Sequence, residues 1–273
     1  MKKLLSVLLA VVMVLSMFSV TSFAVQDNSA STARATASSF SITDFLENLI
    51  QSFDDFFAEL FGAGKNLPDV SGWTDEEIID YYISAAKKSN ETTVSQEILT
   101  FDYIEDGEED SVYDSLLPLV RRTTGNTVYE FEGITGDFEK LTVNDCESVD
   151  AYKKGRYIVV DIVLKNQSDS MNNEEAFVNT VSHGMSIVDK QALKDAFTEL
   201  GVTVDVSEGN VLFDYTNAKI SVRIDSDGYI RKGTWSHNLD INLENIILVF
   251  DGLDMPMDMV AGFTHKTKTG SIF

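Results

Sequence analysis

The sequence predicts an α+β fold in which a long-stranded, curved antiparallel sheet, a half-barrel, wraps around helices. The first observation is the segment 217–243, where apolar and polar residues alternate on both sides of the turn Ser226-Asp227-Gly228, as in a β-hairpin. The second is the length of the arm Tyr229–Leu243, which favours a twisted, curved sheet because ordinary strands are about five or six residues long. The third is the helical spacing of apolar residues in 41–61 and 75–89.

Residues 1–24 have the features of a secretory signal peptide. Lys2 and Lys3 precede an apolar run, and Ser22-Phe23-Ala24 supplies the small residues typical of a cleavage site. We expect cleavage after Ala24, and a mature protein that is secreted or associated with a bacterial cell envelope. The alternative is that the segment is kept as an anchor, because its apolar run is slightly long for a signal peptide. A second hydrophobic span is not expected.

The net charge disfavours some classes of partner, and the cysteine content excludes an intramolecular disulfide. The chain has 21 Lys and Arg against 44 Asp and Glu, a net charge of −23, so we expect it to repel nucleic acid and anionic lipid surfaces. Cys146 is the single cysteine, so no intramolecular disulfide can form and stability must come from a buried core. Acidic neighbours should raise the pKa of this thiol, so we expect it to be inert.

Two segments precede the main domain, which is expected over 65–273. Residues 25–40 are small and polar without a period, as in a flexible linker. Residues 41–64 form a Phe-rich amphipathic helix that begins at Ser41, continues to Phe61 and ends at Gly62-Ala63-Gly64. We expect this helix to cover the open face of the sheet as a lid. The alternative is that it docks on a protein partner or a membrane, although its acidic face argues against anionic membranes.

The main domain is expected to contain these elements in order. A helix over 75–89 begins with the capping box Thr74 and Glu77, and a long strand follows over 92–104. The further predictions are a short helix within 110–120, a four-stranded meander over 126–132, 138–143, 146–153 and 155–165, a polar loop over 166–173, helices over 173–183 and 186–200, strands over 202–206, 211–215 and 246–250, and a loop-like tail from 251. Gly233 is the expected bend of the long hairpin.

This order of elements, together with the phrase AKISVRIDSDGYIRKGTW, resembles the LolA- and LppX-like lipoprotein-carrier superfamily. The resemblance covers about residues 74–250. It implies a curved sheet half wrapped around helices, with an apolar cavity for acyl chains or other hydrophobic ligands. The chain departs from that pattern in two respects, because it has no lipobox cysteine and because it carries the Phe-rich helix 41–64.

Five residues of the hairpin are candidates for the wall of such a ligand site. Trp235, His237, Leu239 and Ile241 alternate along one strand, and Tyr229 has the same parity. An imidazole on that face can bind a ligand head group; the alternative is a core histidine whose hydrogen bonds are satisfied within the protein.

No residue set indicates catalysis, a metal or a cofactor. His183, His237 and His265 are too scattered to indicate a catalytic triad. The pair Asp225 and Asp227 lacks the other ligands of a calcium loop and is better explained as a hairpin turn, and the acidic loops 105–110 and 166–175 are better explained as solvated than as weak calcium sites. The run Met255, Met257 and Met259 has thioethers that soft Cu(I) prefers, but no cysteine accompanies it.

The leading functional hypothesis is an exported, non-enzymatic binding protein that holds a hydrophobic or amphipathic ligand in a cavity of the curved sheet. The alternative is a cell-surface interaction or structural module whose sheet is filled by its own side chains. An enzyme acting on envelope polymers is a third hypothesis, but paired acids at an informative spacing are missing from the sequence. A lined apolar interior would favour the first hypothesis over the second.

Overall fold

The computed structural model describes residues 67–105, 127–172, 180–188, 191, 198, 202–205, 209–250 and 253–270. The signal peptide, the linker, the Phe-rich helix 41–64, the short helix within 110–120 and most of the helix 186–200 lie outside these ranges. Those elements stay predictions.

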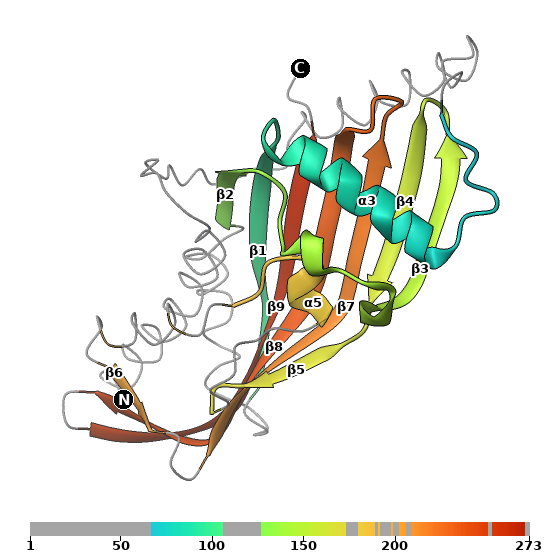
Figure 1. Cartoon of the computed structure of the whole chain (residues 1–273). Helices are drawn as coiled ribbons and strands as arrows, with labels where there is room; N and C mark the ends of the chain where they lie inside the picture. The colour runs from blue at the N-terminus through green and yellow to red at the C-terminus, as the bar shows by residue number, and fades with distance from the viewer. Residues whose placement is uncertain are drawn as a thin grey trace.

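The described chain forms an open, curved antiparallel sheet with few helices (Figure 1). Its main path has the order β2-β1-β9-β8-β7-β4-β3, while β5 pairs with β7 and β6 pairs with β8. The strands are β1 Val94–Glu105, β2 Thr127–Glu132, β3 Cys146–Lys154, β4 Tyr157–Leu164, β5 Gln167–Ser170, β6 Val202–Asp205, β7 Asn210–Ile224, β8 Ile230–Phe250 and β9 Leu253–Gly270. The antiparallel sheet and its long strands are therefore confirmed.

The predicted hairpin is the pair β7 and β8. Its turn is held by Asp225, whose Oδ1 accepts from the backbone N–H of Asp227 at 2.9 Å and of Tyr229 at 3.0 Å. Gly228 has a φ of +80°, the left-handed conformation that glycine adopts at little cost. Both strands extend beyond the predicted segment, to Asn210 in β7 and to Phe250 in β8.

Two bulges explain why the sequence divides these strands into shorter ones. Asn217 and Asn245 have φ values of +54° and +48°, and the pairing register shifts at both places. At such a bulge the alternation slips by one residue. The buried position therefore changes from Tyr215 to Ala218, and the same slip occurs on the far side of Leu243. The segments 211–215 and 246–250, predicted as separate strands, are the outer ends of β7 and β8.

The predicted loop-like tail is wrong, because most of it is strand β9. This strand lies between β1 and β8 and is the last element of the described chain. Residues Met259, Ala261 and Phe263 are buried, followed at the same spacing by His265, Thr267 and Thr269. The alternation is regular, but its second half consists of polar residues, which a hydrophobic pattern does not reveal.

Three of the four strands predicted for the meander are present, as β2, β3 and β4, but the meander itself is wrong. Residues 138–143 contain the 3-10 turn η1 Phe138–Lys140 and lead into a second turn, η2 Val143–Asp145. Strand β2 pairs with β1, whereas β3 and β4 lie at the opposite edge of the sheet. Part of the predicted polar loop is strand β5. Strand β4 does lie between two others, as its apolar residues on both faces predicted.

Helix α3 Asp75–Asn90 lies across one face of the sheet, which we call the inner face (Figure 1). The predicted capping box is confirmed, with the Glu77 N–H donating to Thr74 Oγ1 at 3.3 Å and the Thr74 N–H donating to Glu77 Oε2 at 2.8 Å. The helix buries Ile78, Ile79, Tyr82, Ala85, Ala86 and Ser89. A short helix, α5 Thr180–Gly184, packs near the centre of the same face.

The core lies between the inner face and these helices, in a single cluster that includes residues of α3, α5 and most strands. Trp235, Tyr82, Tyr215 and Phe213 are its largest fully buried side chains. Within the described ranges, no helix has both the length and the apolarity needed to cross a membrane.

Candidate functional site

The inner face contains a group of buried polar residues on three neighbouring strands. We call this group the inner polar patch. It consists of Ser95 and Glu97 on β1, His237 on β8, and His265, Thr267 and Thr269 on β9. Each is at most 4% exposed, so the group lies within the protein and not on its surface.

The strand register places these residues in adjacent rows. Thr267 lies between Glu97 on one side and Trp235 on the other. In the next row, His265 lies between Leu99 and His237. Side chains directly opposite in neighbouring strands are about 4.5–5.5 Å apart at Cβ, and diagonal ones about 7–8 Å. The patch is therefore continuous across β1, β9 and β8, whereas the inner positions of β7 and β4 are apolar.

Glu97 and His265 form the closest polar contact of the patch, with Oε1 and Nε2 2.5 Å apart. Burial raises the pKa of Glu97 well above its ordinary value. Burial also lowers the pKa of His265 to about 3. Both shifts favour the neutral forms, because charge is costly in a low-dielectric interior. We therefore assign the proton of this contact to Glu97, whose carboxylic acid donates to Nε2 of the neutral His265 imidazole.

His237 is held by three aromatic or sulfur contacts. Its Nδ1 lies 3.1 Å from Sδ of Met185, and its ring centroid lies 4.7 Å from that of His265 and 5.4 Å from that of Tyr215. Burial, and then the neighbouring His265, lower the pKa of His237 well below its ordinary value. In the neutral ring, Nδ1–H donates to the weak sulfur acceptor, so Nε2 carries the lone pair.

Two atoms of the patch lack a hydrogen-bond partner among the described residues. They are Nε2 of His237 and Oγ1 of Thr267. The other hydroxyl groups are satisfied, since Ser95 donates to the Gly133 carbonyl at 2.6 Å and Thr269 donates to the Val94 carbonyl at 3.1 Å. Leaving a buried polar atom without a partner costs about 1–3 kcal/mol.

Apolar side chains surround the patch. Trp235 lies beside it on β8 and donates from Nε1 to the hydroxyl oxygen of Tyr82 on α3 at 2.9 Å. Phe101 and Phe263 meet edge to face beyond it, with centroids 5.1 Å apart. A wall of this kind excludes water and strengthens the polar interactions that it encloses.

Gly233 makes room for this arrangement. It pairs regularly with Val222 on β7 and with Thr269 on β9, so the strand has no bulge at this position, and a bend there stays a prediction. A Cβ atom at position 233 would lie 2.2 Å from Cη2 of Trp235, far inside van der Waals contact. The glycine is needed because the indole ring lies over its backbone.

Four of the five predicted wall residues share the inner face, as predicted. Trp235, His237, Leu239 and Ile241 are all buried there. Tyr229 is not among them, because Arg231 is an extra residue in the register and Ile230 takes the inward position. The Tyr229 ring lies at the hairpin turn, half-buried, with Nζ of Lys88 4.5 Å from its centroid. A ligand-binding role of any of the five stays a prediction.

Sequence reasoning missed Glu97, His265 and Thr267, although two alternating runs contain them. Ser95 and Glu97 are in phase with Leu99 and Phe101, and His265 and Thr267 are in phase with the buried apolar residues of β9. Their spacing alone could have placed these residues on the inner face, even though they are polar. In the same strand Met259 is buried and Met257 packs against the core, so both serve as apolar residues.

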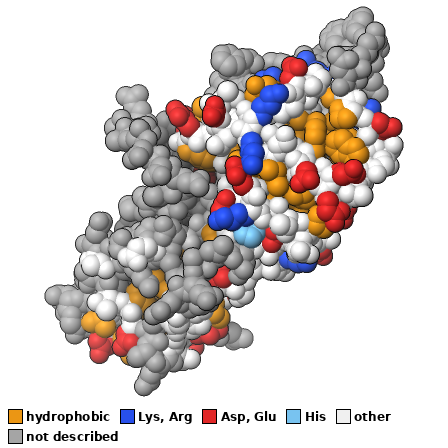
Figure 2. All heavy atoms as spheres, viewed as in Figure 1, with side chains coloured by type: hydrophobic (Ala, Val, Ile, Leu, Met, Phe, Trp, Pro, Cys, Tyr) orange, Lys and Arg blue, Asp and Glu red, His pale blue; other side chains and the backbone are white. Residues whose placement is uncertain are grey.

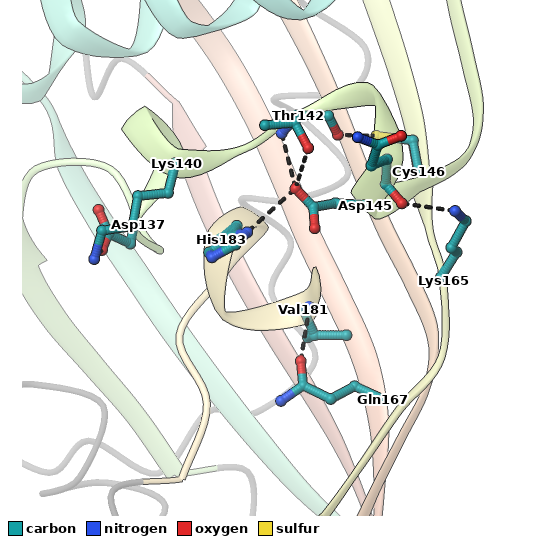
Figure 3. Close-up of polar contacts among 10 residues, drawn as sticks. Asp137, Lys140, Thr142, Asp145, Cys146, Lys165, Gln167, Val181 and His183 are labelled. Atoms are coloured by element: carbon teal, nitrogen blue, oxygen red, sulfur yellow. Dashed lines mark hydrogen bonds and ion pairs between the residues drawn. The ribbon is translucent and has the colours of Figure 1, made fainter. Parts of the chain in front are cut away.

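A second polar cluster joins α5 to η2 (Figure 3). Oδ2 of Asp145 accepts from the Thr142 N–H and hydroxyl, each at 2.8 Å, and lies 3.2 Å from Nδ1 of His183. Nearby, Cys146 Sγ donates to the Thr142 carbonyl at 3.4 Å. Burial, with Asp145 and Asp75 adding to it, raises the pKa of this thiol to about 12, so it is protonated and poorly nucleophilic. This cluster fastens α5 in place.

On the face seen in Figure 2, apolar side chains gather toward the upper right of the described part, with charged side chains around them. Acidic and basic side chains are interspersed over the face that carries α3. Val94 and Tyr152 are the large hydrophobic residues that the described part exposes. The inner polar patch is therefore the strongest candidate site of the described chain.

Comparison with known proteins finds no relative of this chain. No family model, no curated protein and no solved structure matches the chain. Functional inference therefore rests on the chemistry of the inner face.

Proposed function

We propose that this protein is an exported, non-enzymatic binding protein that holds a hydrophobic or amphipathic ligand against the inner face of its curved sheet. The observation that carries the proposal is that two buried atoms of the inner polar patch, His237 Nε2 and Thr267 Oγ1, lack a hydrogen-bond partner among the described residues, while apolar side chains surround the patch. Ligand sites combine a mostly apolar lining with a few convergent polar groups that orient the ligand.

The energetic cost of these atoms supports a functional role. Two unpartnered buried groups together cost on the order of 2–6 kcal/mol, a large fraction of the stability of an ordinary domain. Apolar residues would fill both positions without that cost, as they do in the same rows of β7 and β4. A ligand that supplies the missing hydrogen bonds would recover much of the lost free energy on binding.

The protonation of the patch supports binding over catalysis. A general acid or base works best when its pKa lies near the working pH. Burial raises the pKa of Glu97 and lowers those of His237 and His265, which favours neutral side chains at pH 7. Neutral groups suit the recognition of a ligand better than the exchange of a proton.

The half-barrel form and the carrier resemblance belong to this proposal. The curvature of the sheet and the position of α3 across its inner face support them. Export rests on the signal-like residues 1–24. We further propose that the helix 41–64 covers the ligand or meets a protein partner, because its Phe-rich face is too apolar to stay in water.

Native mass spectrometry of the protein purified from the organism that makes it tests the proposal. We expect a non-covalent mass that organic extraction removes, together with a lower melting temperature of the extracted protein, because a ligand that binds only the folded state stabilises it. Adding the extract back should restore the melting temperature. Homogeneous ligand-free protein whose melting temperature is insensitive to extraction would refute the proposal.

The alternative is an interaction or structural module whose interior is filled by its own side chains. The observation in its favour is the close packing of Trp235, Tyr82, Phe213 and Tyr215, all fully buried. This alternative predicts the ligand-free outcome of the same experiment. It also predicts that apolar replacement of His237 and Thr267 stabilises the protein and leaves its partner binding unchanged.

A further inference from the structure

We infer that the ligand is an uncharged amphiphile with a hydroxyl group, which donates its O–H to His237 Nε2 and accepts from the Thr267 hydroxyl. This inference rests on the proposed binding function and specifies the head group. Its basis is the hydrogen-bonding character of the two atoms that lack a partner among the described residues.

His237 requires a donor from the ligand. Its Nδ1 lies 3.1 Å from Met185 Sδ, a group that can only accept, so the ring proton is on Nδ1 and Nε2 is an acceptor. Ether, ester and ketone oxygens cannot donate, so they leave Nε2 without a partner. An alcohol can donate to it.

Thr267 completes the recognition of a hydroxyl group. Its register position is opposite Trp235, while His265, two residues earlier, is opposite His237. Thr267 and His237 are therefore diagonal neighbours on one face, within reach of one head group. The Thr267 hydroxyl can donate to the ligand oxygen while that oxygen donates to His237. An alcohol combines both roles in one atom.

The charge of the patch argues against ionic head groups. The buried polar residues of the described chain include no Lys or Arg, so a carboxylate or phosphate would have no cation to pair with. Glu97, which burial favours in its neutral form, would likewise give a cationic head group no counter-charge. Burying an unpaired charge is far costlier than burying a hydroxyl group that has its hydrogen bonds.

A matched set of probes tests the head group on the full exported chain. 1-Decanol, decyl methyl ether, decanoate and decylamine have the same alkyl chain, and each is used to displace the neutral dye N-phenyl-1-naphthylamine at pH 7.5. We expect the alcohol to bind on the order of tenfold tighter than the ether, because only the alcohol donates to His237. We expect the two charged probes to bind more weakly than the alcohol.

Three variants test whether the preference for the alcohol depends on His237 Nε2 and Thr267 Oγ1. His237→Phe should abolish the preference for the alcohol over the ether, and His237→Gln, which keeps an acceptor, should retain part of it. Thr267→Val is nearly isosteric and should weaken the alcohol severalfold. Thr264→Val is the matched control, because Thr264 lies on the same strand but its hydroxyl donates to Asp102, at 2.6 Å, on the other face of the sheet. It should leave the preference unchanged.

The outcomes separate this inference from the proposed function. Equal affinity for the alcohol and the ether, or tightest binding of a charged probe, would overturn the hydroxyl inference and leave the binding function standing. If no probe displaces the dye and native preparations are ligand-free, both proposals fail. If His237→Phe does not fold, as judged by near-UV circular dichroism, the wild-type comparison of alcohol with ether and the Thr267→Val variant decide the question.

Discussion

Replacement of Gly233 by alanine tests the packing of the inner face at a single methyl group. The added Cβ would lie 2.2 Å from Cη2 and 2.3 Å from Cζ3 of Trp235, and 3.0 Å from Cγ2 of Thr269. The indole ring must therefore move. Overpacking of this kind costs about 1–3 kcal/mol. Displacement of the ring also threatens its hydrogen bond to Tyr82, which contributes about 0.5–1.5 kcal/mol.

We therefore expect Gly233→Ala to lower the free energy of unfolding by about 2–4 kcal/mol. Urea denaturation followed by circular dichroism, with linear extrapolation to water, measures this value. Gly270→Ala is the control, because Gly270 ends strand β9 and a Cβ there would meet nothing within 4 Å. We expect that variant to change stability by less than about 1 kcal/mol.

A double-mutant cycle identifies the cause. Trp235→Phe removes the outer ring that contains Cη2 and Cζ3, so Gly233→Ala should cost clearly less in the Trp235→Phe background. Equal costs in both backgrounds would show that the glycine is needed for its backbone and not for the space it leaves. A cost of Gly233→Ala no larger than that of Gly270→Ala would refute the packing argument altogether.

The buried ionisable groups and the α5 cluster give three further predictions. Burial lowers the pKa of His237 well below its ordinary value and that of His265 to about 3, so the unfolded chain takes up protons at these residues as the pH falls below about 6.5, which reduces stability. Burial also raises the pKa of Glu97 well above its ordinary value, so the folded chain keeps a proton there that the unfolded chain loses, and this effect increases stability as the pH falls. Because the two effects oppose each other, the contribution of His237 is measured by comparison with a variant: in urea titrations, the change in stability from pH 7.5 to 5.0 should be about 2 kcal/mol less favourable for the wild type than for His237→Phe. The same pH dependence in both proteins would contradict the neutral assignment of His237. The Cys146 thiol, whose pKa is raised to about 12, should react with a disulfide reagent at pH 8 only after unfolding, and rapid reaction of the native protein would contradict its burial. Asp145→Ala should cost about 1–2 kcal/mol and weaken amide-exchange protection in α5, whereas unchanged protection there would mean that this carboxylate does not fasten the helix.

The hairpin could be predicted from the sequence because its inward residues are apolar and its turn is Asp-Gly. Ala218, Ile220, Val222 and Ile224 are all buried, as their spacing requires. Strand β9 could not be recognised in the same way, because half of its inward positions hold histidine or threonine. Hydrophobic periodicity detects an apolar face and overlooks a polar interior.

The candidate site could be predicted only on one strand. His237 lies in the predicted hairpin, but Glu97 and His265 are separated by 168 residues and meet through the pairing of β1 with β9. A long-range pairing of this kind leaves no local pattern. Tyr229 was misplaced for a local reason. The alternation predicted that it faces inward, but the extra residue Arg231 in the register shifts the pattern by one, so Ile230 faces inward instead.

The position of β9 determines when the inner polar patch can form. Among the described strands, β9 is the last in the sequence, and β1, the first, lies beside it. The hairpins β7–β8 and β8–β9 close over short loops and can form early, whereas the pairing of β1 with β9 must wait for a long loop to close. The contact between Glu97 and His265 is therefore expected among the last events of folding. If the chain is exported in an extended state, as we propose, it would reach the outside with the two halves of the patch still separate. The proposed binding site would then form only once β1 and β9 had paired.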